Sequence, residues 1–340
     1  NISGGGMLTL KDYRTFIEGP NNTYTGGTLV PGYGSGNQLY IAANSSLGPS
    51  GTVTVWNAGT DWGNSRAGLI LNGDGNLTAA HRLILNSFNS YAMFKSANPV
   101  VGSIEGNGTI SFGTDAIAAT LRVGGNNLST DFFGLLSDAD YFSVARTGLD
   151  LGTLVKEGTG TLTLWGECWY RGGTIISNGT LCVNNWMHPS NVIVVKPNGT
   201  LDGIGSVGIV SNQGGTVRGN LYIRSLNLDS ASTFAVTLGG TNVVTDFAQL
   251  HVTEGVKLNS DGGAGSTLVL TLHYAPQVGQ TFKILDNASA GAVSGQFSTG
   301  RIVSATYGGR TYYFSVNTAG GDGNDIELTA LPVGTVISIR

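Results

Sequence analysis

The sequence predicts an all-β protein, and two observations carry that prediction. Short runs of β-branched and aromatic residues recur along the chain, separated by Asn-Gly, Gly-Gly and Asp-Gly turns. Helix signals are scarce, and a candidate such as Asp246–Leu250 is too short to stand alone. Strands with corners at a quasi-regular spacing and no intervening helices are typical of a β-solenoid or a β-sandwich.

The expected strands are short, and most of them alternate apolar and polar residues, as half-buried strands do. In chain order they are Gly51–Trp56, Gly68–Gly73, Arg82–Ser87, Gly108–Gly113, Thr161–Trp165, Asn191–Val195, Asn220–Leu228, Thr267–Leu272, Thr311–Val316 and Asp325–Thr329. An Asn-Gly-Thr triplet followed by an apolar residue recurs at Asn107, Asn178 and Asn198. We interpret the triplet as a β-corner in which Gly accepts a positive φ and Thr opens the next strand.

Each triplet is also an N-glycosylation acceptor pattern, and that alternative remains open. The same pattern occurs at Asn1, Asn21, Asn44, Asn76 and Asn127.

The composition indicates a folded and rigid chain. Of 340 residues 54 are Gly, while charged residues make up 11% and hydrophobic residues 40%. Disordered chains are charge-rich and apolar-poor, which is the reverse. The net charge of −4 and the lack of any Lys/Arg run argue against nucleic acid as a partner. No apolar stretch approaches the ~18–20 residues of a membrane helix, so we expect no membrane insertion.

The chain divides into two expected parts. Residues 1–230 have short strands, Gly/Asn corners and almost no charge, and there a solenoid is favoured over a sandwich. Residues 231–340 differ and predict a compact antiparallel β module that caps the solenoid. Because the chain starts at Asn1 without a signal peptide, we expect a processed mature chain or an excised fragment.

Two segments carry a family resemblance. The segment "KEGTGTLTLWGECWYRGGTIISNGTLCVN" (Lys156–Asn184) resembles the autotransporter-associated β-strand repeat, and "GGGMLTL" (Gly4–Leu10) with "NTYTGGTLV" (Asn22–Val30) is similar. The tail around "GGDGNDIELT" resembles a C-terminal module of Verrucomicrobia-like surface proteins. The resemblance implies a right-handed parallel β-helix, secreted or on the cell surface, and it implies no activity.

Both copies of the repeat contain Tyr-x-Gly-Gly-Thr between strand patterns. A catalytic loop used twice and a recurring structural unit are the two explanations. We interpret Gly-Gly-Thr as a corner and the Tyr as a stacking residue.

Residues that could do chemistry are few. Asp138 and Asp140 would share one face of a strand, with Arg146 to stabilise an anion, although a solvated turn is the favoured explanation. Asp202, Asp229 and Asp261 are isolated, and His81, His188, His251 and His273 are dispersed. "GGDGNDIEL" (Gly320–Leu328) partly matches a calcium-binding nonapeptide, but Glu327 replaces its apolar residue and a turn is the simpler interpretation. We therefore expect no enzyme activity, no metal and no cofactor.

The cysteines and aromatic residues leave alternatives. Cys168 and Cys182 are the only cysteines, and in an exported protein a disulfide between them is favoured over two buried thiols. The aromatic residues form either a sugar-stacking strip or core ladders. They are Tyr24, Trp56, Trp62, Trp165, Trp169, Tyr170 and Trp186.

Three classes of function remain. The leading hypothesis is an extracellular structural protein, a subunit of a self-assembling filament, sheath or layer. The alternatives are a surface adhesin that binds glycans and, from fold analogy alone, a polysaccharide-cleaving enzyme. Assembly would use the uncharged final strand, through Val333, Val336, Ile337 and Ile339, unless that strand pairs within its own module. Alternatively, the first coil of one subunit would stack end to end on the last coil of its neighbour.

Overall fold

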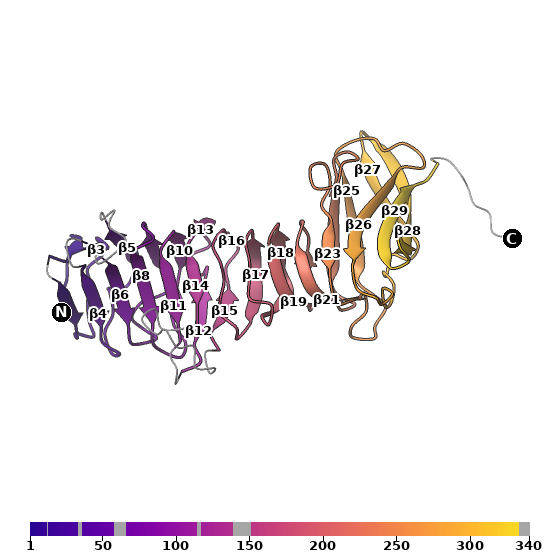
Figure 1. The fold of residues 1–340 in the computed structure, drawn as a ribbon. Helices are drawn as coiled ribbons and strands as arrows, with labels where there is room; N and C mark the ends of the chain where they lie inside the picture. Colours follow the sequence, from indigo (N-terminus) through magenta and orange to yellow (C-terminus); the bar gives the residue numbers. More distant parts are fainter. Residues whose placement is uncertain (12, 33–35, 58–65, 114–116, 139–150, 333–340) are drawn as a thin grey trace. The chain divides into compact units, whose positions relative to one another are not determined.

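The computed structural model describes residues 1–11, 13–32, 36–57, 66–113, 117–138 and 151–332. Within these residues every regular element is a β-strand and there is no helix (Figure 1). Accordingly, no helix of this part of the chain could cross a membrane. The chain forms two compact units, Asn1–Val192 and Ile193–Arg340.

The first unit is a parallel β-helix. Its strands stack coil upon coil, and each pairs in parallel with the equivalent strand of the next coil. The first face consists of β1 (Leu8–Thr9), β3 (Thr28–Gly32), β5 (Gly51–Asn57), β7 (His81–Leu85), β10 (Ser103–Gly106), β13 (Thr130–Phe132) and β16 (Thr161–Leu164).

Two further faces close the helix. The second consists of β2 (Arg14–Ile17), β4 (Gln38–Ile41), β6 (Ala67–Leu71), β8 (Ser90–Phe94), β11 (Thr109–Phe112) and β14 (Leu135–Ser137). The third, present only in the later coils, consists of β9 (Val100–Val101), β12 (Thr120–Val123) and β15 (Thr153–Lys156). Strand β17 (Thr174–Val183) pairs with β15 at its start and with β16 at its end, so it bends from the third face to the first.

The core of this unit is built from ladders of apolar side chains. One ladder on the first face repeats the same inward position on successive strands, and its members are at most 1% exposed. These residues are Val30, Val55, Leu85, Phe132, Leu164 and Val183. Burying each side chain contributes about 1.5–3 kcal/mol, so the stacked coils stabilise one another.

The repeated Tyr-x-Gly-Gly-Thr segment forms the same corner twice. The hydroxyl groups of Tyr24 and Thr28 lie 2.6 Å apart, and those of Tyr170 and Thr174 lie 2.8 Å apart, all in the core. The second glycine of each copy has a positive φ, 86° at Gly27 and 109° at Gly173. The first glycine lies against backbone in both copies, so a Cβ there would collide with the neighbouring coil. The segment is therefore a structural corner with a buried tyrosine.

The second unit begins with parallel strands and ends with antiparallel ones. Its parallel strands are β18 (Val192–Gly203), β19 (Ser206–Asn212), β20 (Thr216–Val217), β21 (Tyr222–Leu228), β22 (Thr233–Leu238), β23 (Leu250–Val252), β24 (Val256–Lys257), β25 (Thr267–Leu272) and β26 (Thr281–Asn287). The antiparallel strands that follow β26 are β27 (Ile302–Tyr307), β28 (Arg310–Gly320) and β29 (Asp325–Ala330), with β29 also pairing with β26.

Antiparallel pairing thus begins at Thr281–Asn287, later than the sequence indicated. The long loops between β22 and β26 disguise the coil spacing, which is why the segment looked like a separate module. The boundary predicted at residue 230 lies inside this second unit and stays a prediction. Asp246–Leu250, the helical candidate, is a turn that leads into β23.

The predicted all-β fold, a parallel solenoid followed by antiparallel strands, is confirmed. Each of the ten expected strand segments overlaps an observed strand. Of the three predicted Asn-Gly-Thr corners, the one at Asn178 has the expected backbone, because Gly179 has a φ of 66° at the bend of β17. The prediction is wrong for the other two triplets, since Gly108 and Gly199 do not have a positive φ and Asn198 lies within β18.

Candidate functional site

Of the predicted carboxylate pair, only Asp138 lies among the described residues. Asp138 is buried, and its Oδ2 accepts the backbone N–H of Arg171 at 2.7 Å and lies 3.8 Å from Arg171 Nε. Asp140 and Arg146 lie outside the described residues. Asp138 therefore ties the end of β14 to the Tyr170 corner, which is a structural role.

The three isolated aspartates have local partners. Asp202 pairs with Arg218 at 2.7 Å, and Asp229 accepts the hydroxyl of Ser232 at 2.7 Å. Asp261 accepts the hydroxyl of Ser230 at 2.6 Å, and this hydrogen bond is the main cause that lowers the pKa of its carboxyl.

The structure does not bring the two cysteines together. Neither is in a disulfide: Cys168 is buried in the turn before the Tyr170 corner, whereas Cys182 lies on the outward side of β17. This arrangement is closer to the alternative of two thiols, of which only Cys168 is buried. Burial raises the pKa of the Cys168 thiol to about 12, so it is inert at neutral pH.

The histidines are dispersed, as the sequence indicated. His81 is buried, and its Nδ1 accepts the N–H of Thr78 at 3.0 Å. His251 stacks on Tyr222 with ring centroids 4.6 Å apart, and its Nδ1 lies 3.1 Å from Asp286. His273 is exposed.

The segment Gly320–Leu328 consists of the last residue of β28, a turn over residues 321–324 and the start of β29. The Asp325 carboxylate within it accepts the N–H of Asn287 at 2.9 Å and lies 3.1 Å from Lys283 Nζ. In the part of the chain that the structure describes, no three His, Cys, Asp or Glu side chains gather to hold a metal ion. The assembly candidates Val333, Val336, Ile337 and Ile339 lie outside that part.

The aromatic residues named from the sequence separate into two groups. Tyr24 and Tyr170 belong to the core, where burial raises the pKa of both hydroxyls. Trp165, Trp169 and Trp186 lie at the surface of the first unit instead. Trp56 is half-buried on β5, and Trp62 is not among the described residues.

The surface tryptophans meet because three turns stack in register. Phe132, Leu164 and Val183 pair just before the turns, and Leu136, Cys168 and Met187 form bridges within or just after them. Between these points, and directly after Cys168 and Met187, the chain presents five aromatic side chains, which we call the aromatic patch. They are Phe133, Trp165, Trp169, Trp186 and His188.

The rings of the aromatic patch contact one another pairwise. Phe133 and Trp165 are stacked, 6.0 Å apart at an interplanar angle of 7°. Trp169 and Trp186 lie 4.8 Å apart at 55°, and His188 meets the edge of Trp186 at 5.8 Å. In the described residues Phe133 is 56% and Trp165 42% exposed, and exposed apolar rings of this size often mark a binding surface.

Polar groups border the same rings. Trp165 Nε1 donates to Asp131 Oδ1 at 3.0 Å, and Trp169 Nε1 donates to Glu167 Oε2 at 2.8 Å. Asn185 Nδ2 donates to the carbonyl of Trp165 at 2.9 Å. The indole planes are thus held in fixed orientations beside carboxylates that have a second oxygen available, since no other partner of Asp131 or Glu167 exists among the described residues.

Sequence reasoning missed Phe133, Asp131 and Glu167 as members of this site. The signal was present in the sequence. Phe133 directly follows the end of β13 at Phe132, and Trp165 directly follows the end of β16 at Leu164, the strand that pairs with β13. Without the coil length, however, the two segments could not be placed side by side.

Sequence reasoning also missed a buried cation. Lys156 occupies an inward position between Val123 and Ile176 on neighbouring coils. Its Nζ donates to the carbonyls of Glu157, Gly158 and Asn178 at 2.7, 3.0 and 3.1 Å. Burial lowers the pKa of Lys156 to about 8.

Comparison with known families matches the two segments that share the tyrosine corner. Residues 3–31 and 154–183 match the passenger-associated-transport-repeat. The chain therefore carries two copies of a repeat of autotransporter passenger domains, which supports a secreted or surface-exposed protein. The repeat is not known as an enzyme family. The match does not extend to the C-terminal module, and no curated protein matches the chain.

Proposed function

We propose that this chain is the passenger part of an exported surface protein and that it binds glycans through the aromatic patch. The observation that carries the proposal is the set of mutually oriented, exposed and half-buried rings in and beside the second passenger repeat, residues 154–183. A soluble surface rarely leaves such rings uncovered unless they bind something.

The chemistry of the patch favours a sugar over another protein surface. A sugar ring has a C–H face that packs on an aromatic plane and hydroxyls that bond to polar groups around it. Asp131 and Glu167 provide acceptors, and the amide of Asn185 lies beside Trp165. Aromatic rings bordered by polar groups therefore suit a ligand that has one apolar face and hydroxyl groups along its edge.

Retention on insoluble polysaccharides tests the proposal. We expect the wild-type chain to bind cellulose, chitin, xylan or bacterial peptidoglycan in a pull-down assay. Trp165→Ala and Trp186→Ala should each weaken binding by about 1 kcal/mol, roughly fivefold, and together by more than tenfold. The matched control is Tyr313→Ala, an exposed aromatic residue of β28 far along the chain. Retention that is unchanged in the double variant would contradict the proposal.

A filament, sheath or layer subunit is the second candidate. It is supported by Phe16 on β2, which is 61% exposed and stacks on Tyr40 of β4 at a centroid distance of 4.9 Å. An exposed apolar ring of this kind can pack against a second copy of the chain. Sedimentation at rising concentration tests it: Phe16→Asp should abolish any polymer, and a wild-type chain that stays monomeric would contradict it.

A further inference from the structure

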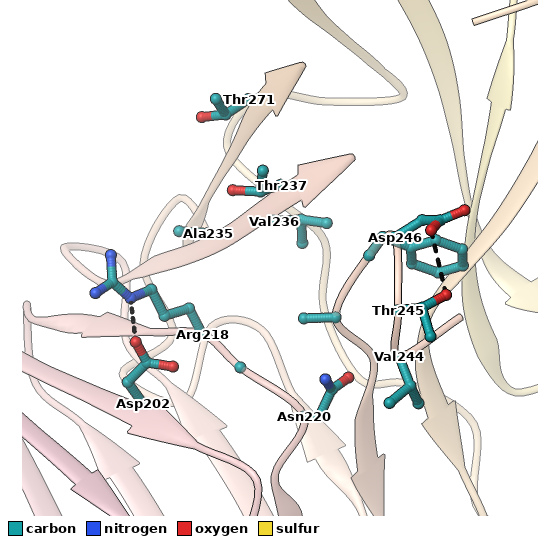
Figure 2. A pocket seen from close by; sticks show the side chains of 13 residues that line it. Asp202, Arg218, Asn220, Ala235, Val236, Thr237, Val244, Thr245, Asp246 and Thr271 are labelled. Atoms are coloured by element: carbon teal, nitrogen blue, oxygen red, sulfur yellow. Dashed lines mark hydrogen bonds and ion pairs between the residues drawn. The ribbon is translucent and has the colours of Figure 1, made fainter. Parts of the chain in front are cut away.

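The second unit carries a hollow of its own, of about 400 Å³ (Figure 2). One side is formed by Asp202, Arg218 and Asn220, the floor by Ala235 and Thr237, and the other side by the loop that contains Asp246. This volume lies within the range of small-molecule sites, about 300–1,000 Å³.

Coil stacking explains the floor. Leu201 pairs with Val217 through neighbouring strands, and Val217 pairs with Phe234. The next residues outward are Asp202, Arg218 and Ala235, which therefore occupy one surface position on three successive coils. Ala235 has the shortest side chain of the three, so the surface is lower at β22 than at the two neighbouring coils, and this depression is the floor of the hollow.

The opposite wall is a loop held in a strained conformation. Asp246 Oδ2 accepts the N–H and the side-chain amide of Asn242, both at 2.9 Å, and the backbone N–H of Gly239 donates to the carbonyl of Asp246 at 2.8 Å. Val244, which lines the hollow, has a φ of 75°. A β-branched residue in this region is a genuine outlier, and such strain concentrates at functional sites.

The polar groups around the hollow point to the class of ligand. Arg218 Nε is bonded to Asp202, which leaves its terminal amino groups as donors toward the open space. Asn220 Oδ1 accepts the N–H of Gln249 at 2.7 Å, so its amide N–H₂ is the group that remains to donate. Thr237 adds a hydroxyl. With two carboxylates against one guanidinium, the site disfavours anions, whereas a hydroxyl can both donate and accept.

We infer that this hollow binds a short neutral saccharide, as a second glycan site separate in sequence from the aromatic patch. The inference rests on the proposed function for its choice of glycans. The site would recognise the polar edge of a sugar through hydrogen bonds, whereas the patch would hold its apolar face.

Calorimetry on the full chain tests the inference, with maltose, cellobiose, xylobiose, mannobiose and chitobiose as probes. At least one should bind. Ala235→Phe fills the hollow, Arg218→Met removes its donors, and each should weaken binding at least about tenfold. The matched control is Thr233→Phe, which places the same ring on the same strand outside the hollow. It should leave the affinity within about twofold, and melting temperatures check that all variants fold.

The two sites have separate readouts because none of the residues that line the hollow is a tryptophan. A saccharide in the hollow should leave tryptophan fluorescence unchanged and should still bind the Trp165→Ala/Trp186→Ala variant. The inference is overturned if none of the probes binds, or if Ala235→Phe leaves the affinity unchanged. It is also overturned if binding disappears only in the tryptophan variant, a result that would leave the proposed function intact.

Discussion

The two copies of the passenger repeat have the same interior and a different exterior. Tyr24 and Tyr170 are both buried against a threonine hydroxyl, and each corner turns through a glycine with positive φ. The residues that flank the tyrosine outward are Thr23 and Thr25 in the first copy but Trp169 and Arg171 in the second. The repeat thus fixes how a coil closes and leaves the surface free to vary.

The two copies also send the chain onto different faces. After the first corner, Thr28 pairs with Leu8 on the first face. After the second, Thr174 pairs with Leu154 on the third face, and the chain returns to the first face only after Gly179. One corner motif therefore serves coils of two shapes, and a match to the motif does not by itself give the coil.

The largest expected effect comes from removing the shared interior. Tyr170→Ala should lower the free energy of unfolding by about 4 kcal/mol, because a large buried ring leaves a cavity. Tyr24→Ala should cost about 3 kcal/mol, since Tyr170 additionally packs on Phe112 with ring centroids 5.1 Å apart. Urea denaturation measures both. Tyr170→Phe is the control and should lower the free energy of unfolding by about 1 kcal/mol, for the lost hydrogen bond. If Tyr170→Ala lowers it by less than Tyr170→Phe does, the tyrosine ring does not stabilise the corner.

Lys156 sharpens the comparison, because it is buried, whereas Lys11, the lysine of the first copy, is exposed. Lys156→Met should destabilise the chain at pH 7 by about 2 kcal/mol, since three carbonyls lose their donor while the cost of burying a charge is recovered. Lys257→Met, on an exposed position of β24, is the control and should change the free energy of unfolding by less than about 0.5 kcal/mol.

The pH dependence gives a second test of Lys156. The folded-state pKa of about 8 lies below the ordinary value of 10.5, so between these pH values the unfolded chain binds a proton that the folded chain does not. The stability of the wild type relative to Lys156→Met should therefore rise as the pH increases from 8 to 10.5 and should be flat below 8. The difference between the two proteins is the quantity to follow, because Cys168 and Tyr170 have raised pKa values and destabilise the fold at alkaline pH in both. A difference that does not change with pH would show that the ammonium is not buried.

A smaller effect on stability is expected from the exterior. Trp169→Thr gives the second copy the outward residue of the first, Thr23. It should cost less than about 1.5 kcal/mol, the worth of its contact with Trp186, while polysaccharide retention falls severalfold. If Trp169→Thr strongly destabilises the chain but leaves its retention on polysaccharide unchanged, Trp169 stabilises the fold and does not bind the ligand.

The interior was largely predictable from the sequence, whereas the candidate sites were not. Inward residues such as Val55 and Leu164 follow the period-two alternation, and every expected strand was found. The register that sets Phe133 on Trp165 depends on coil length, which the alternation does not contain. The burial of Lys156 could not be predicted either, because a lysine at an inward position breaks the apolar alternation. One of its three carbonyl partners comes from Asn178, which lies on another strand.

The smallest effect on stability, and the sharpest on chemistry, concerns the cysteines of the second copy. Neither is in a disulfide, so reduction should leave the intact mass and the melting temperature unchanged. Iodoacetamide attacks the thiolate, and a pKa of about 12 leaves Cys168 almost none at pH 8. Cys182 faces outward on β17 and should react in the native state. We therefore expect one carbamidomethyl group per native chain, on Cys182, and two after unfolding in urea. Loss of two hydrogens from the native mass would reveal a bond between the cysteines, and modification of native Cys168 would show that the corner behind Tyr170 opens.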